Sequence, residues 1–279
     1  MAEQWITEQL HPFYRKSLRV QEVLVDEQTP YQHIQLVQTE FFGKTLLLDG
    51  IIQLTERDNS GYHEMITHVP LLAQGNPKQV LIVGAGDGGS LQQVLRYPSV
   101  EQVVVCELDR RVVEVCTEHF PQFGHPFANE RAELVIQDAF DYLQHSGHKF
   151  DVIISDTTDP IGPAEKLFSV KFYQLMVQAL TPNGAIATQC EQMFFDAALI
   201  KQMMSIAKGL VRHPAYYYTL VPTYPGGGIG FMYLSDQAWT HGLNTPYPPG
   251  QMHYLNPEIH RAAFALPEFF KRMLNDNAP

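Results

Sequence analysis

Short runs of alternating hydrophobic and polar residues predict a small β-sheet in the first part of the chain. Residues 20–28, 32–40 and 44–56 are rich in leucine and β-branched residues and alternate in part. Turn signals separate these runs and divide the last of them, among them Thr29-Pro30 and Asp49-Gly50. We therefore expect residues 1–57 to form a domain of antiparallel strands.

From residue 58 onward, helical segments alternate with buried strands. Residues 62–74 have the apolar spacing of a helix and end before Asn76-Pro77. The near-continuous apolar strands expected beyond this helix are residues 79–86, 102–109, 132–138, 150–156 and 185–191. Their alternation with helical segments is typical of an α/β domain whose mostly parallel sheet carries helices on both faces. We expect residues 58–279 to form this domain.

Composition and charge narrow the possible classes of function. No apolar run approaches the roughly 18 residues that span a bilayer, and we expect neither a signal peptide nor a membrane partner. Three cysteines are too few and too scattered for a disulfide framework or a zinc site, so we expect a cytoplasmic protein. The net charge of −11 disfavours a nucleic-acid surface and is compatible with a cationic ligand.

A glycine-rich loop from Gly84 to Gly89 follows the first strand of the expected parallel sheet and precedes a helix. Glycine lets the backbone turn tightly and approach a ligand closely, and this position favours a nucleotide site over a simple turn. Glu107 ends the next strand, where its carboxylate can accept hydrogen bonds from both hydroxyls of a ribose. The sequence therefore predicts that a nucleoside binds here.

Asp87, within the glycine loop, distinguishes two kinds of nucleotide. A dinucleotide would place its pyrophosphate against the loop and the helix N-terminus, where a fixed carboxylate would repel it. The same carboxylate attracts an ammonium or a sulfonium group. We therefore favour a cationic nucleoside of the S-adenosyl type, with a tail that carries an amine and no carboxylate.

Three further aspartates follow strands of the same sheet. Asp138 is suited either to cap the next helix or to accept a hydrogen bond from an adenine amino group. Asp156 and Asp159 lie in a proline-rich loop, which is either a plain structural loop or an amine site. An amine must lose a proton as its nitrogen forms a new bond, so Asp156 is our candidate for the proton acceptor. We expect Asp159 to hold a cationic amine.

Polar side chains at the start of the 62–74 helix are expected to face the same cleft; they are Tyr62, His63 and Glu64. His63 and His68 are five residues apart, so they do not share a helix face as the histidines of an HExxH zinc helix do, and we expect no metal. Tyr224 either covers the amine or packs in a proline–glycine turn.

These segments together resemble the spermidine synthase family of polyamine aminopropyltransferases. The matching stretches are LDGIIQLTERD, YHEMITHVPL, VLIVGAGDGGSLQQVLRYPSVEQVVVCELD, FDVIISDTTDPIGPAEKLFS, FYQLM, PTYPGGGIGFM and IHRAAFALPEF. They cover nearly the whole chain, and the GDGG and DTTDPIGPAE segments are specific to the family. The resemblance implies a Rossmann-like, methyltransferase-type domain, a small N-terminal β-domain, and assembly as a homodimer or homotetramer.

The resemblance also implies a reaction and a role for each site residue. The aminopropyl group of decarboxylated S-adenosylmethionine, a co-substrate, would pass to putrescine, giving spermidine and methylthioadenosine without a metal or cofactor. Asp156 would accept the proton, Asp87 would hold the aminopropyl ammonium, and the segment after Asp156 would act as a lid. Gln32, Glu107, Asp138, Ala139 and Pro163 would hold the nucleoside. His63, Asp159, Tyr62, Gln53 and Tyr224 would contact or support the amines.

Two departures from the family pattern fall near the predicted site. Ala85 stands where the family often has glycine, and Asn59, Ser60 and Gly61 replace the usual residues beside the diamine site. Three other functions stay open. They are aminopropyl transfer to another amine (agmatine, cadaverine or spermidine), methyl transfer from S-adenosylmethionine, and polyamine binding without catalysis. Asp87 argues against methyl transfer, and Asp156 argues against binding alone.

Overall fold

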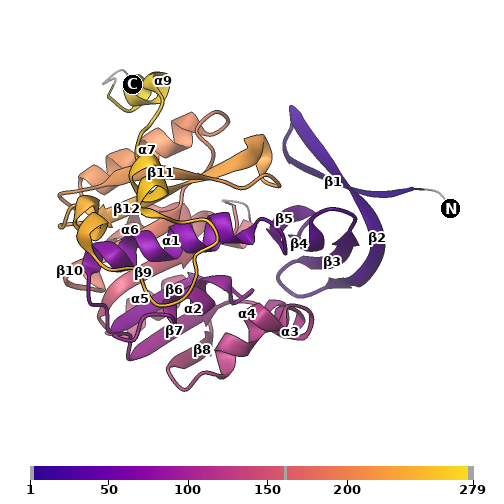
Figure 1. Cartoon of the computed structure of the whole chain (residues 1–279), viewed down its shortest axis with the longest axis horizontal. Helices are drawn as coiled ribbons and strands as arrows, with labels where there is room; N and C mark the ends of the chain where they lie inside the picture. Colours follow the sequence, from indigo (N-terminus) through magenta and orange to yellow (C-terminus); the bar gives the residue numbers. More distant parts are fainter. Residues whose placement is uncertain (1–2, 160–161, 276–279) are drawn as a thin grey trace.

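The computed structural model describes residues 3–159 and 162–275 and contains two β-sheets, a smaller N-terminal sheet and a larger one (Figure 1). The smaller sheet has the order β1-β2-β3-β4-β5 and is antiparallel throughout. Its strands are β1 (Gln4–His11), β2 (Tyr14–Gln28), β3 (His33–Thr39), β4 (Gly43–Leu48) and β5 (Ile51–Thr55). The predicted turn joins β4 to β5, with Asp49 and Gly50 at φ values of 49° and 78°. This confirms the expected antiparallel sheet.

Strand β1 was not among the predicted strands. Half of its side chains are exposed, and the one that is buried is the acidic Glu8. A strand without a hydrophobic face gives no alternating signal, so the periodicity of the sequence could not indicate it.

The larger sheet has the strand order β11-β12-β10-β9-β6-β7-β8. Its strands are β6 (Gln79–Gly84), β7 (Gln102–Glu107), β8 (Ala132–Ile136), β9 (Phe150–Asp156), β10 (Leu180–Gln189), β11 (Ala215–Leu220) and β12 (Gly228–Ser235). Strands β6 to β10 are parallel to their neighbours in that group, and β12 runs antiparallel to both β10 and β11. This sheet confirms the expected Rossmann-like α/β fold.

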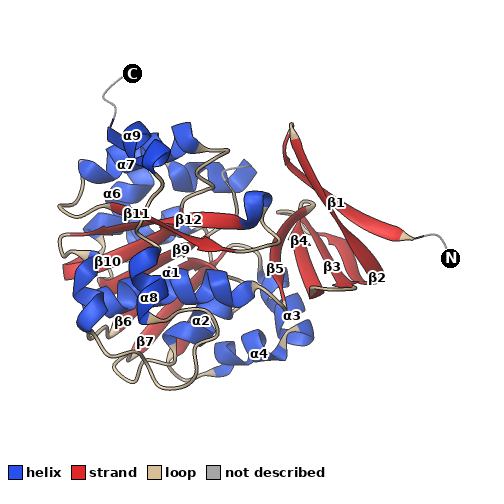
Figure 2. Ribbon diagram, turned by 45° about the horizontal axis from the view of Figure 1, so that its top comes forward, coloured by secondary structure: helices blue, strands red, loops and turns tan. Residues whose placement is uncertain are grey.

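Helices cover both faces of the larger sheet (Figure 2). The α-helices are α1 (Asn59–Gln74), α2 (Gly89–Val94), α3 (Arg110–His119), α4 (Pro121–Gly124), α5 (Ala139–His145), α6 (Val170–Gln178), α7 (Ala197–Lys208), α8 (Pro257–Ala262) and α9 (Glu268–Asn275). The 3-10 helices are η1 (His125–Ala128), η2 (Gly162–Phe168), η3 (Pro225–Gly227) and η4 (Trp239–Asn244). Successive side chains of β6 point to opposite faces of the sheet and join different hydrophobic cores. Ile82 belongs to the core that contains Met65 of α1, and Leu81 belongs to the core that contains Phe172 of α6.

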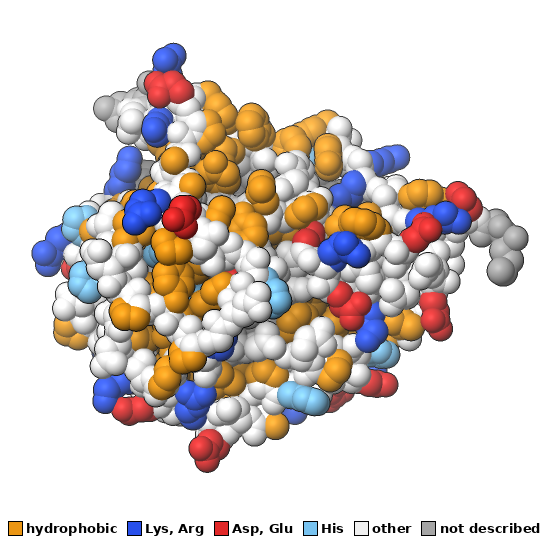
Figure 3. Space-filling view, in the orientation of Figure 1, with side chains coloured by type: hydrophobic (Ala, Val, Ile, Leu, Met, Phe, Trp, Pro, Cys, Tyr) orange, Lys and Arg blue, Asp and Glu red, His pale blue; other side chains and the backbone are white. Residues whose placement is uncertain are grey.

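The surface mixes side chains of all kinds. On the face drawn in Figure 3, acidic and basic groups are interspersed and hydrophobic side chains lie between them. Within residues 3–159 and 162–275, no helix has the length and apolar character needed to cross a membrane.

Glu64 joins the C-terminal part of the chain to α1. Its side chain is fully buried and accepts the backbone N–H groups of His253, Tyr254 and Leu255, at 2.8, 3.0 and 2.8 Å. These donors offset the cost of removing a charge from water. Glu64 is two residues from Tyr62, or about 200° around the helix axis, so the expectation that it faces the cleft is wrong.

We expect Glu64→Ala to lower the free energy of unfolding by about 2–4 kcal/mol, because three backbone N–H groups lose their acceptor. Glu64→Gln keeps one side-chain oxygen and should lose less. Urea unfolding at a fixed protein concentration measures both changes. Equal stability of Glu64→Ala and the unmodified chain would contradict this structural role.

Candidate active site

A cavity of about 440 Å³ is lined by the smaller sheet and by the carboxyl ends of the parallel strands. The carboxylates on its wall are Asp49, Asp87, Glu107, Asp138, Asp156, Asp159, Glu191 and Asp196. The strand order explains the position of the cavity. Strands β7 and β8 follow β6 on one side of the sheet, and β9 and β10 lie on its other side, so the order of the strands reverses at β6. Open α/β sheets bind their ligands in the crevice that forms there.

Asp156, at the end of β9, is held from two sides. The Tyr62 hydroxyl donates to Oδ1 at 2.8 Å, and the Ser90 hydroxyl donates to Oδ2 at 2.6 Å. Burial, followed by the neighbouring Asp87 carboxylate, raises the pKa of Asp156 to about 6, against the opposing effects of His63 and the two hydroxyl groups. A carboxyl group with this pKa is ionised at neutral pH and is still basic enough to accept a proton.

The glycine loop lies directly against the strand end that carries Asp156. Gly84 has a φ of 77°, and a Cβ there would lie 2.2 Å from the Asp156 backbone oxygen. Ala85 donates its N–H to the same oxygen at 2.9 Å and has a φ of 57°. This left-handed conformation is uncommon for residues other than glycine, so the Ala85 departure is accommodated with some backbone strain.

Asp87 is a charged group held by the glycine loop and α1. Its Oδ1 accepts the Gly89 N–H at 2.6 Å, and its Oδ2 lies 3.3 Å from His63 Nε2. Burial raises the pKa of Asp87, but His63 and the Gly89 N–H outweigh it, and the net pKa is lowered. Burial lowers the pKa of His63, but the Asp87 carboxylate outweighs it, and the net pKa is raised. Asp87 therefore stays ionised, with its carboxylate on the cavity wall.

Glu107 and Gln32 lie at the end of the cavity predicted to hold the ribose. Glu107 Oε1 accepts the Asp109 N–H at 2.9 Å, and burial raises the pKa of Glu107 to about 7 despite this donor. The Gln32 amide donates to Asp109 Oδ2 at 3.1 Å, which fixes the smaller sheet against the end of β7. Two hydroxyl donors from a ligand would satisfy the buried Glu107 carboxylate.

Asp138 caps the next helix, which is one of the two functions that its position in the sequence indicated, and its contact with an adenine amino group stays a prediction. Its Oδ1 accepts the Phe140 N–H at 2.9 Å and so caps α5, next to Ala139. Its Oδ2 contacts the Lys166 ammonium, which comes from η2. An adenine amino group that bound Asp138 would share this oxygen with Lys166 or displace it. The side chain of Pro163 lies outside the part of the chain that the structure describes, as do residues 160–161 of the predicted lid.

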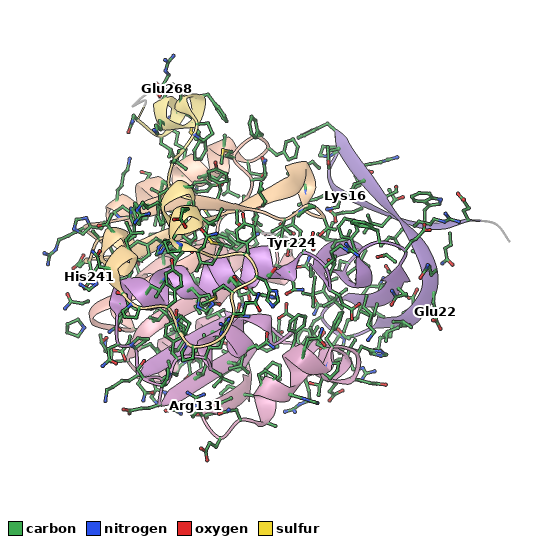
Figure 4. The ribbon with its side chains drawn as sticks, viewed as in Figure 1. Lys16, Glu22, Arg131, Tyr224, His241 and Glu268 are labelled. Atoms are coloured by element: carbon green, nitrogen blue, oxygen red, sulfur yellow. The ribbon has the colours of Figure 1, made fainter. Side chains whose placement is uncertain are left out.

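Tyr224 meets the smaller sheet across the cavity. Its hydroxyl donates to the Gln53 backbone oxygen at 2.6 Å. The Lys16 ammonium lies 6.0 Å from the centre of the Tyr224 ring, and Figure 4 labels both residues where the two parts of the molecule meet. Lys16 Nζ is also 3.0 Å from Glu8 Oε2 and contacts the Thr223 carbonyl. These contacts hold the Tyr224 loop in place.

Asp159, Gln189 and Glu191 form the opposite end of the cavity. Gln189 Nε2 lies 3.5 Å from Asp159 Oδ1 and 3.3 Å from Glu191 Oε1. Burial, followed by the Glu8 carboxylate, raises the pKa of Asp159 to about 6. Burial, followed by Asp159, raises the pKa of Glu191. Carboxyl groups this close together retain protons when no cation separates them, and an ammonium ion would replace those protons.

The predicted site residues line one cavity, with two exceptions. Those that line the cavity are Gln32, Gln53, Tyr62, Asp87, Glu107, Asp138, Ala139, Asp156, Asp159 and Tyr224. His63 is 2% exposed and lies behind Asp87, so its contact with an acceptor stays a prediction, as do the roles of the others. Pro163 is the second exception, because its side chain lies outside the part of the chain that the structure describes.

One expectation about neighbouring residues needs correction. Asn59, Ser60 and Gly61 are not among the described residues that line the cavity, and a Cβ at Gly61 would lie 2.4 Å from the Leu220 backbone oxygen. These residues shape the packing of α1 rather than the amine site.

The described part of the chain holds no cluster of three metal-ligating side chains. His68 instead hydrogen-bonds the Tyr97 hydroxyl at 2.9 Å.

Asp159→Asn is expected to stabilise the empty protein at pH 8 by about 1–3 kcal/mol. The folded-state pKa of Asp159, about 6, exceeds its ordinary value of 3.8, so the folded chain holds this proton more tightly than the unfolded chain. The cost of ionising Asp159 is therefore fully present above pH 6 and disappears as the pH falls toward 4.

Thermal or urea unfolding of both proteins across this pH range measures the difference. The stabilising effect should shrink as the pH falls, because the unmodified side chain then becomes neutral as well. A variant that is less stable than the unmodified chain at pH 8 would contradict this description of Asp159.

Two family models match the chain. Residues 59–242 match the spermine/spermidine synthase domain, and residues 4–56 match the spermidine synthase tetramerisation domain. The chain is 42% identical over 262 residues to a spermidine synthase of Dictyostelium discoideum. The aligned region covers 93% of this chain and 92% of that protein. It is also 42% identical over 275 residues to a polyamine aminopropyltransferase of Thermoanaerobacter sp. (strain X514). This aligned region covers 98% of the chain and 99% of that protein.

Solved structures share the fold over almost the full length. A crystal structure of spermidine synthase in complex with the transition-state analogue AdoDATO has a TM-score of 0.92 and 33% identity, covering 97% of this chain and 94% of that one. The spermidine synthase of Thermotoga maritima has a TM-score of 0.89 and 31% identity, with the same coverage.

Proposed function

The chain belongs to the spermine/spermidine synthase family, and we propose that it transfers the aminopropyl group of decarboxylated S-adenosylmethionine to putrescine. The products are spermidine and methylthioadenosine. The observation that carries this proposal is the pair of carboxylates at the centre of the cavity. Asp87 is held ionised beside Asp156, whose pKa is about 6.

The two carboxylates have different tasks in the reaction. Asp87 binds the ammonium of the aminopropyl group, because its charge is fixed by His63 and the Gly89 N–H. Asp156 orients the acceptor nitrogen, and the Tyr62 and Ser90 hydroxyls in turn orient Asp156. A donor tail that also carried a carboxylate would bring a negative charge toward both aspartates. The site therefore favours the decarboxylated donor over S-adenosylmethionine itself.

The chemical step is a direct displacement at the carbon next to the sulfonium. The neutral acceptor nitrogen forms a C–N bond as the C–S bond breaks, and the bonding pair leaves with sulfur to give a neutral thioether. The new ammonium then loses a proton to Asp156. Placing both substrates in one cavity makes the reaction effectively intramolecular, which supplies much of the rate.

Each end of the cavity serves one substrate in this proposal. Gln32, Glu107, Asp138 and Ala139 hold the nucleoside, together with Pro163. Gln53, Tyr62, Asp159 and Tyr224 hold the diamine, whose distal ammonium replaces the proton retained by Asp159. His63 holds the Asp87 carboxylate, and its contact with the diamine or the product stays a prediction.

The decisive experiment incubates the purified chain with decarboxylated S-adenosylmethionine and a panel of amines, and identifies the products by mass. We expect spermidine and methylthioadenosine from putrescine. Preferred turnover of agmatine, cadaverine or spermidine would change the acceptor. Methyl transfer from S-adenosylmethionine without aminopropyl transfer would overturn the reaction class, and tight polyamine binding without turnover would leave only a binding protein.

Asp156→Asn should lower kcat by about 10²–10⁴-fold, because the amide cannot accept the proton. Its affinity for methylthioadenosine, measured by titration calorimetry, should stay near that of the unmodified chain. Asp141→Asn, a change at an exposed aspartate of α5, is the matched control and should keep full activity. Full turnover by Asp156→Asn would remove this residue from its role.

Asp87→Asn should weaken binding of the decarboxylated donor at least about tenfold, because the ammonium loses its charged partner. Methylthioadenosine lacks that ammonium and should bind almost as before. Calorimetry with both ligands gives the comparison. Equal losses for the two would show that Asp87 acts only on the shape of the loop.

Assembly, domain division and location complete the proposal. The match to a tetramerisation domain over residues 4–56 supports a homodimer or homotetramer built through the smaller sheet. We place the division between residues 1–57 and 58–279, and the protein in the cytoplasm. No metal or bound cofactor has a part in the reaction as proposed, because the sulfonium is itself the activated leaving group.

A further inference from the structure

The acceptor end of the cavity carries more carboxylates than a diamine requires. In the proposed reaction one amine nitrogen of a diamine binds at Asp156 and the other at Asp159. Glu191 and Asp196 also line this end of the cavity. Glu191 is 5% exposed. A buried carboxylate is costly unless a cation or a set of donors accompanies it. The wall beyond Asp159 therefore has the chemistry of a second ammonium subsite.

Two observations besides the carboxylates indicate that this wall is built to receive a ligand. Gln189 is 4% exposed and lines the cavity, and its Oε1 has no hydrogen-bond partner among the described residues. Glu191 adopts a left-handed φ of 50°. Its backbone oxygen is fixed by the Gly230 N–H and the Tyr216 hydroxyl, both at 2.9 Å. Backbone strain of this kind in a non-glycine residue is concentrated at functional sites.

His11 faces this subsite from the smaller sheet. It ends β1, in the hairpin that lies toward the larger part of the molecule (Figure 2), and its Nε2 is 3.7 Å from Asp196 Oδ2. Both atoms are buried without another partner in the described chain, and both residues line the cavity. The ring is held in place by stacking on Phe13, with centroids 5.4 Å apart, and by Phe195 at 5.0 Å.

We propose that His11 is the specificity-determining end stop of the acceptor site. Its ring occupies the position that a second ammonium of a longer amine would take beside Asp196 and Glu191. The site therefore selects a diamine over a triamine. This inference rests on the proposed aminopropyl transfer and names the residue that limits its acceptor.

His11→Ala tests the proposal, with putrescine and spermidine as competing acceptors of decarboxylated S-adenosylmethionine. Removing the ring exposes Asp196 and Glu191 to the added ammonium, so the ratio of kcat/KM for spermidine to that for putrescine should rise at least about tenfold. Adding Asp196→Asn to His11→Ala should reverse most of this gain. His11→Ser provides a second variant should the alanine variant fold poorly.

The matched control is His33→Ala. His33 also pairs with an aspartate, with its Nε2 2.7 Å from Asp26 Oδ1. Both residues of this pair belong to the smaller sheet, are partly exposed and are absent from the cavity lining. Its acceptor ratio should not change. An unchanged ratio in both His11 variants, with normal putrescine turnover, overturns this inference alone. Absence of putrescine turnover in the unmodified chain overturns the proposed function and this inference with it.

Discussion

Repulsion between carboxylates that are shielded from water is the constraint on which the architecture of this cavity depends. Each such group loses hydration, and each raises the cost of ionising its neighbours. Asp87 is kept charged by His63 and a backbone N–H. Asp156 is kept in place by two hydroxyl donors, whereas burial and the Glu8 carboxylate leave Asp159 with a raised pKa. The empty site is thus least stable where a positively charged ligand would bind.

Two sheets are needed to arrange these groups. The parallel strands place an acid after each of several strand ends, and this accounts for Asp87, Glu107, Asp138 and Asp156. The smaller sheet closes the cavity from the other side with backbone atoms and neutral side chains such as Gln32 and Gln53. Most of the carboxylates that line the cavity therefore come from the larger part of the chain, and the smaller sheet adds Asp49 and His11.

The sequence predicted the parallel sheet and the acids at its edge because both have local signals. A buried strand is a run of apolar residues, and a residue that follows it must lie at the sheet edge. The sequence did not predict β1, since a strand with one buried side chain has no period. It also did not assign His11, Glu191 or Asp196, because these residues come from separate segments and meet only in the folded chain. Glu64 was misplaced for a related reason, since the three N–H groups that it binds come from residues 253–255.

The bond between Glu64 and those N–H groups also affects the order in which the enzyme matures during synthesis. Helix α1 emerges early from the ribosome, yet His253, the first donor to Glu64, lies 189 residues later in the chain. Tyr62, which orients Asp156, is on the same helix. A nascent chain therefore cannot complete the packing of this helix until residues 253–255 have been made, and fragments that end before residue 253 leave the buried Glu64 side chain without these three donors.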